Sequence, residues 1–188
     1  QQGHVLYANV DHFYLPVAYQ DSLLTGVIKL TRDAHDCVIT EVRDAAGLTT
    51  TAEYDWRFLM PVRITDANDN VHSATPDAQG RVTSTRFYGT ENGGAAGYSD
   101  TAFTPPQAAD AALALSAPQP VHQCMVYVTD SWQQKDSLRQ PPHVLTLTTD
   151  RYDSDPAQQI RRQVVFSDGF GRVLQTAVRH EAGPAWQR

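Results

Sequence analysis

Residues 33–87 read DAHDCVITEVR DAAGLTTTAEY DWRFLMPVRIT DANDNVHSATP DAQGRVTSTRF, with an aspartate at the head of each 11-residue block. These aspartates are Asp33, Asp44, Asp55, Asp66 and Asp77. An aspartate with glycine three positions later suits a type I turn, because its carboxylate accepts backbone N–H groups and glycine tolerates a positive φ. The spacing therefore predicts one turn per block.

The third position after each aspartate differs between blocks. Glycine or another turn-prone residue takes it in three blocks, as Gly47, Asp69 and Gly80, whereas Asp36 and Phe58 take this place after Asp33 and Asp55. Asp55 therefore begins the poorest turn. The last block begins with an Asp-x-x-Gly-Arg-Val pattern at 77–82, and this pattern returns at 168–173. The residues predicted to form turns are Asp33, Asp44, Gly47, Asp55, Asp66, Asn70, Asp77, Gly80, Asp168 and Gly171.

Between the turns lie six or seven residues, the usual length of a strand. Phe58, Met60, Val62 and Ile64 alternate with other residues, which is typical of a strand with one apolar face. Short turns join antiparallel strands, so the sequence predicts a mainly β fold, an antiparallel meander. Pro61 is expected at an edge, a bulge or a strand end. Further strands are predicted over 12–19, 27–30, 37–42, 48–54, 121–129, 143–149, 160–166 and 172–180.

The chain is expected to have three segments: a β-meander over 1–88, a connection over 89–120 and a second β segment over 121–188. Gly89–Gly97 has the composition of a mobile loop. One short α-helix is predicted in the connection, over Ala108–Leu115. Thr104 is its expected N-cap, with Pro105 at the first helical position and Gln107 completing a capping box.

Charge and hydropathy exclude some classes of partner. The 15 Lys and Arg against 21 Asp and Glu give a net charge of -6, which argues against nucleic acid. No apolar run approaches the roughly 18 residues of a membrane span, so no direct membrane insertion is expected. The chain starts Gln1-Gln2-Gly3 without a leader, so we expect a piece of a longer protein.

Few residues suggest chemistry. The histidines show no metal-ligand spacing, and the start of a calcium loop at Asp66–Asn70 lacks the required glycine and glutamate; neither a metal nor a cofactor is expected. Cys37 and Cys124 lie in apolar runs, which favours buried thiols over a disulfide. Trp56 and Trp132 are either core residues or sugar-stacking residues. Asp153 and Asp155 are imaginable as an acid and base, but a solvated loop explains them better.

The ordered motifs resemble a known family. YDW at 54–56, ITDANDN at 64–70 and the two Asp-x-x-Gly-Arg-Val turns look like RHS or YD repeats. The order of these motifs, with the helix between them and VVFSDGFGRV at 164–173 after it, is similar to the middle region of the B component of bacterial Tc toxin complexes. The turns that lack glycine, at Asp36, Phe58 and Asp69, depart from this pattern, so they are expected to be bulged or longer.

The resemblance implies a structural role. In that family RHS strands wind into a hollow β-shell that, with the C component, encloses a cytotoxic C-terminal segment, and a propeller of the B component docks on the pore-forming A component. The implied function is a non-enzymatic segment of shell wall in a secreted insecticidal toxin. Its implied partners are the rest of the B component and the C component, and indirectly the A component. The alternatives are a carbohydrate-binding or cell-surface adhesion module and, last, a hydrolase that uses Asp153 and Asp155.

Overall fold

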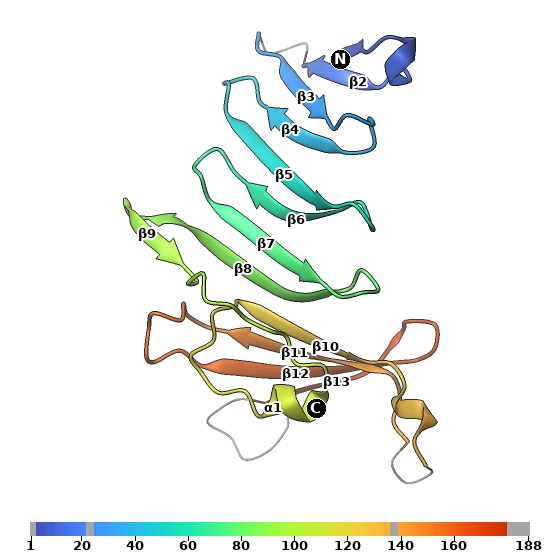
Figure 1. The fold of residues 1–188 in the computed structure, drawn as a ribbon, viewed down its shortest axis with the longest axis vertical. Coiled ribbons are helices and arrows are strands. Elements are labelled where there is room, and N and C mark those ends of the chain that lie inside the picture. Colours follow the sequence, from blue (N-terminus) through green and yellow to red (C-terminus); the bar gives the residue numbers. More distant parts are fainter. Residues whose placement is uncertain (1–2, 22–24, 136–138, 180–188) are drawn as a thin grey trace. The chain divides into compact units, whose positions relative to one another are not determined.

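The computed structural model describes residues 3–21, 25–135 and 139–179, and there the predicted fold class is confirmed: an antiparallel sheet with one short α-helix (Figure 1). The described strands are hydrogen-bonded in the order β1 to β8 and then β10 to β13, while β9 pairs with β8 beside this path. The chain divides into two compact units, Gln1–Ser73 and Ala74–Arg188. The predicted division into segments 1–88, 89–120 and 121–188 stays a prediction.

The first unit is a meander in which each strand pairs with the next one along the chain. Among its described residues, the buried apolar side chains are Ala18 and Val38. The backbone ladder and the turns therefore carry much of its order. Its strands are β1 (His4–Tyr7), β2 (Pro16–Gln20), β3 (Ile28–Arg32), β4 (Ile39–Arg43), β5 (Thr49–Asp55), β6 (Met60–Thr65) and the start of β7 (Val71–Pro76).

The first predicted strand, 12–19, is wrong in its N-terminal half. A 3-10 turn over Val10–His12 ends at Phe13, whose φ of 55° is left-handed, and Tyr14 also has a positive φ. His12 Nδ1 lies 2.7 Å from Asp36 Oδ2, so a contact between two turns holds this reversal. The alternating apolar residues therefore do not form one strand face, and Phe13 is exposed.

The predicted strand over 37–42 begins two residues late, at Ile39. Cys37 lies in the bend before β4 and is exposed, so its predicted burial is wrong, whereas Cys124 is buried. The apolar run that suggested burial belongs to β4, which begins at Ile39. Val38, the residue just before this strand, is buried. Both cysteines are free thiols.

Pro61 pairs with Tyr54 in β5 beside a register shift at Glu53 and Tyr54. The shift is a β-bulge, because Arg63 faces Glu53 and leaves Val62 as the extra residue. Pro61 therefore has one of its expected places. The bulge also breaks the alternation of the predicted apolar face, and Phe58 lies in the turn before β6.

The second unit contains the end of β7, β8 (Val82–Glu91) and β9 (Gly94–Gly97), and the glycine-rich stretch is no loop. Glu91 pairs with Gly94 across Asn92 and Gly93, whose φ values of 52° and 79° are those of a type I′ hairpin turn. Asn-Gly is a strong signal for this turn. The prediction of a mobile loop was therefore wrong.

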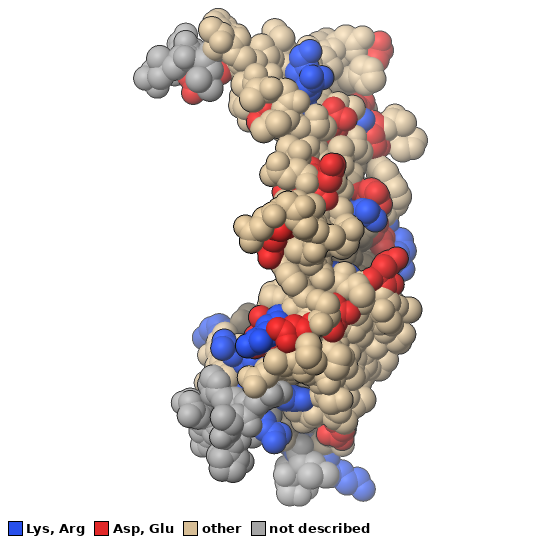
Figure 2. Space-filling model, turned by 90° about the vertical axis from the view of Figure 1, so that its left-hand side faces the viewer, with Lys and Arg blue, Asp and Glu red and all other residues tan. Residues whose placement is uncertain are grey.

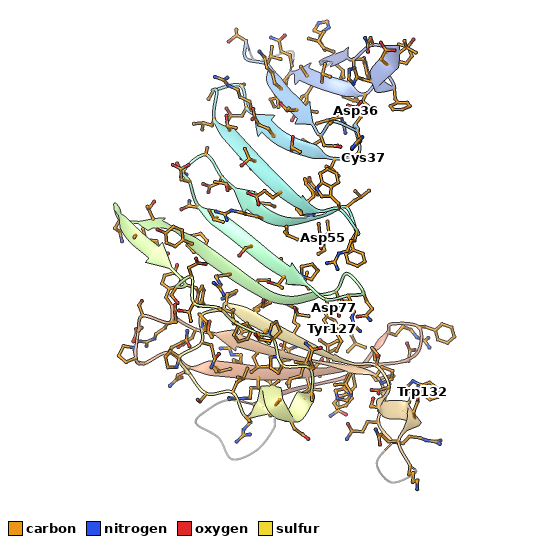
Figure 3. The ribbon with its side chains drawn as sticks, in the orientation of Figure 1. Asp36, Cys37, Asp55, Asp77, Tyr127 and Trp132 are labelled. Atoms are coloured by element: carbon orange, nitrogen blue, oxygen red, sulfur yellow. The ribbon has the colours of Figure 1, made fainter. Side chains whose placement is uncertain are left out.

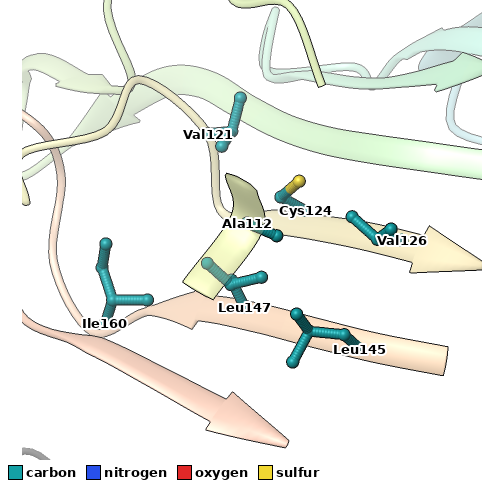
Figure 4. Close-up of a cluster of buried hydrophobic side chains, with 7 residues drawn as sticks. All are labelled: Ala112, Val121, Cys124, Val126, Leu145, Leu147 and Ile160. Atoms are coloured by element: carbon teal, nitrogen blue, oxygen red, sulfur yellow. The ribbon is translucent and has the colours of Figure 1, made fainter. Parts of the chain in front are cut away.

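The remaining strands form an antiparallel ladder with α1 (Ala109–Leu113) packed on it. Seven buried residues make the core: Ala112, Val121, Cys124, Val126, Leu145, Leu147 and Ile160 (Figure 4). The Gln158 side chain binds the backbone of Gln119, in the segment between α1 and β10. Its Oε1 accepts from Gln119 N at 2.6 Å, and its Nε2 donates to Gln119 O at 3.0 Å. The strands are β10 (Gln123–Val128), β11 (His143–Thr149), β12 (Ile160–Ser167) and β13 (Val173–Arg179).

The predicted capping box is wrong. The helix begins at Ala109 after Ala108, which has extended dihedrals and no side-chain cap. Pro105 precedes another proline, and a residue in that position avoids the helical region, so no helix starts at Thr104. Gln107 instead donates its side-chain amide to Pro105 O at 3.2 Å.

Candidate functional site

The aspartates of the repeat share one turn geometry. In four of the turns, Oδ1 accepts the N–H groups two and four residues ahead, and the aspartate N–H returns to the carbonyl four residues ahead. Asp77 shows the pattern: Gln79 N and Arg81 N donate to Oδ1, each at 2.9 Å, and Asp77 N donates to Arg81 O at 2.8 Å. The other members are Asp44, Asp66 and Asp168.

The residue at the third position has a positive φ in all four turns. Glycine takes it at Gly47, Gly80 and Gly171, with φ between 80° and 89°, and Asp69 takes it with a φ of 60°. Asp69 was predicted to make a bulged or longer turn, but this turn closes at Asn70 like those with glycine. An acidic side chain therefore replaces glycine without lengthening the turn.

The other two turns are longer, as expected. Asp33 accepts from Val38 N at 2.8 Å, one residue beyond the usual closing position, and the ladder shifts register nearby. After Asp55 the left-handed residue is Leu59 instead of Phe58. Asp55 and Asp77 lie at strand ends (Figure 3).

A side chain closes several of these turns, and the sequence interpretation missed it. Arg81 Nε donates to Asp77 Oδ2 at 2.7 Å, and Arg172 Nε donates to Asp168 Oδ2 at 2.6 Å. Asn70 Nδ2 makes the equivalent contact to Asp66 Oδ2 at 2.9 Å. The signal was present in the sequence, since each of these donors stands four residues after its aspartate.

Hydrogen bonds hold the pKa of most of these carboxylates below the ordinary value. For Asp33 the largest cause is the Val38 N–H, and for Asp66 it is the Asn70 side chain. The pKa of Asp77 is also lowered; partial desolvation, the largest influence, opposes the shift, and the Arg81 hydrogen bonds outweigh it. The pKa values of Asp55 and Asp168 are lowered by Arg57 and Arg172. These groups are therefore ionised turn formers, unsuited to proton donation near neutral pH.

Trp56 and Trp132 are each 55% exposed, so their expected place in a core or seam is wrong. Trp56 follows β5 in the first unit, with its ring centroid 6.5 Å from that of Tyr54. Trp132 lies in the 3-10 turn Ser131–Gln133 of the second unit (Figure 3). Ser131 is the buried residue of that turn, and the indole beside it stays accessible.

Asp153 and Asp155 have separate partners. Asp153 accepts the N–H and the hydroxyl of Ser99, at 2.9 and 2.5 Å. Asp155 accepts the Ala157 N–H and pairs with Arg151 at 3.0 Å, and these contacts lower its pKa. A general acid needs the opposite shift, so this geometry gives no support to an acid–base pair.

The second unit has a surface groove of about 560 Å³ between the β8–β9 hairpin and the segment around Tyr152. Tyr88, Tyr98 and Tyr152 line it, with small residues of β9. Its charged lining residues, among those described, are Glu91 and Asp153. Its volume lies within the range of about 300–1,000 Å³ of ligand sites.

Contacts between distant residues fix the wall of the groove. Tyr152 donates its hydroxyl to Glu91 Oε1 at 2.7 Å, which raises the pKa of Tyr152 to about 12. The Tyr152 ring meets the Tyr98 ring edge-on at 5.2 Å and stacks with Phe87 at 6.3 Å. Tyr98 is buried, and its hydroxyl lies 2.6 Å from Thr149 Oγ1. No sequence motif marks this set, because three separate segments supply it.

Within the described residues, no group of three or more His, Cys, Asp and Glu side chains could hold a metal ion. No helix there is long and apolar enough to cross a membrane. On the face drawn in Figure 2, basic and acidic side chains are interspersed, and the described part of that face carries no continuous basic patch.

No protein-family model matches the chain, and no curated protein matches it. Solved structures do. A crystal structure of TcdB2-TccC3 is 56% identical with a TM-score of 0.90, and a TcdB2-TccC3-Cdc42 structure is 45% identical with a TM-score of 0.89. The Photorhabdus luminescens Tc holotoxin pore with a TccC3 mutation is also 45% identical, with a TM-score of 0.89.

The matches cover 96% of this chain but only 9% to 11% of the matched chains. The chain thus spans about a tenth of the length of the proteins it resembles. Identity of this level over nearly all its residues, together with the shared fold, goes beyond a likeness of architecture. The chain is TcB-like, similar in sequence and fold to one segment of the Tc toxin B–C component.

Proposed function

We propose that this chain is a non-enzymatic segment of the wall of a Tc toxin shell that encloses a cytotoxic C-terminal cargo. The observation that carries the proposal is the 56% identity and TM-score of 0.90 to a segment of TcdB2-TccC3. The continuous strand order supports it, since antiparallel strands that pair edge to edge can tile a closed wall. The turns at Asp44, Asp66, Asp77 and Asp168 supply the reversals.

The proposed partners follow from the same likeness. They are the remainder of a B component and a C component, which form the shell, and the pore-forming A component, which the assembled shell meets. The matched structures include TcdB2-TccC3 complexes and a holotoxin pore, which supports these partners. The proposed location is outside the producing cell, as part of the secreted complex.

Protease protection tests the proposal. The full-length B component that contains this segment is co-expressed with its C component, and cleavage of the cargo by proteinase K is followed by mass spectrometry. We expect protection in the parent complex. Replacing buried Leu145 with Asp in the core of the second unit should expose the cargo, whereas Gln175→Glu in β13 should leave it protected. A cargo that is cleaved equally fast in the parent complex and when expressed alone contradicts enclosure.

The second candidate is a carbohydrate-binding or adhesion module. The exposure of Trp56 and Trp132 favours it, because exposed indole rings can stack on sugars. A glycan array decides it: binding by the parent chain that Trp132→Ala or Trp56→Ala abolishes supports a lectin role. No binding to the array removes this candidate.

A further inference from the structure

Within residues 3–21, 25–135 and 139–179, one edge of β9 has no strand beside it. Among the described residues, β8 is the only ladder partner of β9. Tyr98 N donates to Phe87 O of β8 at 2.9 Å. The backbone N–H and C=O groups of Gly94 and Ala96, which lie four and two residues before Tyr98, also point towards β8. Since N–H and C=O groups of alternate residues point to opposite sides of a strand, Ala95, Gly97 and Ser99 direct theirs away from β8.

The groove lies beside this edge. Tyr88 and Gly97 pair across the hairpin and share one face with Ala95, while Glu91, Ala96 and Tyr98 belong to the opposite face. The groove is lined by residues of both faces. Asp153 lines the groove and accepts the outward N–H of Ser99, so this wall of the groove stands on the outward side of the segment that continues β9.

The chemistry of the groove selects a cation-bearing occupant. Glu91 and Asp153 are its charged lining residues, and tyrosines lie beside them. Carboxylates and aromatic faces both attract Lys and Arg side chains. Asp153 already accepts the outward N–H of Ser99 at 2.9 Å, so the last outward donor of this edge is bonded and the addressable positions are Ala95 and Gly97.

We propose that the free edge of β9 binds an extended basic peptide segment of another chain. The peptide adds as a strand beside Ala95 and Gly97, and a Lys or Arg side chain lies against the Tyr152 ring and reaches the carboxylates of Glu91 and Asp153 from the groove. The outward backbone groups of Ala95 and Gly97 favour a partner in extended conformation, and the carboxylates that line the groove favour a basic side chain on it. This inference does not depend on the enclosing shell.

Fluorescence anisotropy with two labelled hexapeptides tests the proposal. One alternates Thr and Lys, the other Thr and Glu, and both are capped at their ends. We expect binding of the lysine peptide only, weakened about tenfold or more between 50 and 200 mM salt because charged contacts are screened. Equal binding of both peptides, or none of the lysine peptide at millimolar concentration, overturns the proposal.

Variants separate strand addition from simple charge attraction. Ala95→Pro removes the outward N–H and should weaken binding about tenfold, whereas Ala95→Val keeps the N–H and should bind as the parent does. Glu91→Gln combined with Asp153→Asn should also reduce affinity and flatten the salt dependence. Thermal melts show whether each variant is folded. Equal binding by the folded Ala95→Pro variant, or displacement of the peptide by oligosaccharides alone, refutes the strand-addition mode.

Discussion

The guanidinium of Arg81 lies over the ring of Tyr127, 4.6 Å from its centroid. The same arginine closes the turn of Asp77 with a hydrogen bond of 2.7 Å, and the Tyr127 hydroxyl donates to Val82 O at 2.9 Å. A turn between β7 and β8 is therefore attached to β10, the strand that pairs with β8. Arg172 makes the same turn contact with Asp168, but its side chain is far more exposed.

Arg81→Lys should destabilise the second unit by about 1 kcal/mol, because lysine keeps the charge and loses the planar stacking and the fork. The matched change Arg172→Lys should cost about 0.5 kcal/mol or less, as is usual for an exposed pair. Urea denaturation measures both. A double-mutant cycle with Tyr127→Leu gives the coupling directly, and a coupling of zero would show that Tyr127 contributes nothing.

Acid should weaken the fold through the turn aspartates. Their pKa values are lowered in the folded chain, so they contribute stability above the unfolded pKa of about 4. That stability is lost as the pH falls through the lower folded pKa values, because protonation removes the charged acceptor. The urea midpoint should therefore fall steeply below about pH 4.

Asp66→Asn is the control for this pH effect. Asparagine cannot ionise, so the variant should be less stable than the parent at pH 7, and the difference should shrink as the pH falls towards 2.5. A midpoint that does not change between pH 6 and pH 2.5 would contradict the linkage. A constant difference between parent and variant would show that the Asp66 carboxylate has the same pKa in both states.

The turns were predictable and the contacts between them were not. An aspartate at Asp77 with Gly80 encodes its own reversal, because the hydrogen bonds span four residues. The Asn92-Gly93 hairpin was equally readable, but the surrounding glycines and alanines gave no alternating apolar pattern to mark its strands. Tyr152 and Glu91 meet only after β11 and β12 take their places in the sheet, so no local pattern reveals their groove. Long-range pairing decides such sites.

The prediction of a capping box was wrong for a local reason. The prediction that Cys37 is buried was wrong because the start of the strand was misplaced. Pro106 kept Pro105 out of the helical region, a rule that competes with the favourable position of proline at a helix start. Strand ends are harder to locate than strands, and a difference of two residues moved Cys37 from β4 into a bend. The fold class did not depend on either residue.

Gly97→Ala should destabilise the β8–β9 hairpin by about 1–3 kcal/mol, the usual cost of a strained backbone position. Gly97 has a φ of 125°, and an added Cβ would lie 2.6 Å from Phe87 O and 2.6 Å from Tyr88 Cα. Gly94→Ala is the control, since its nearest atom is Glu91 O at 3.7 Å. Urea denaturation compares the two. A variant at Gly97 as stable as the one at Gly94 would contradict the strain.

The two thiols should react at very different rates with Ellman's reagent. Cys37 is exposed in a bend, whereas Cys124 is buried in the core of the second unit, and burial raises the pKa of the Cys124 thiol to about 11. Since the thiolate is the reactive form, the native chain should release one equivalent of chromophore rapidly and the second only in urea.

Single variants assign these equivalents. Cys37→Ser should abolish the rapid phase, and Cys124→Ser should leave it unchanged. Rapid release of two equivalents from the native chain would mean that the core around Leu145 and Ile160 opens on the time scale of the reaction. Release of none would place Cys37 under cover, against its exposure in the bend before β4. In a longer parent protein the same assay reports whether a neighbouring segment covers the turn of Asp33, because coverage would slow Cys37 alone.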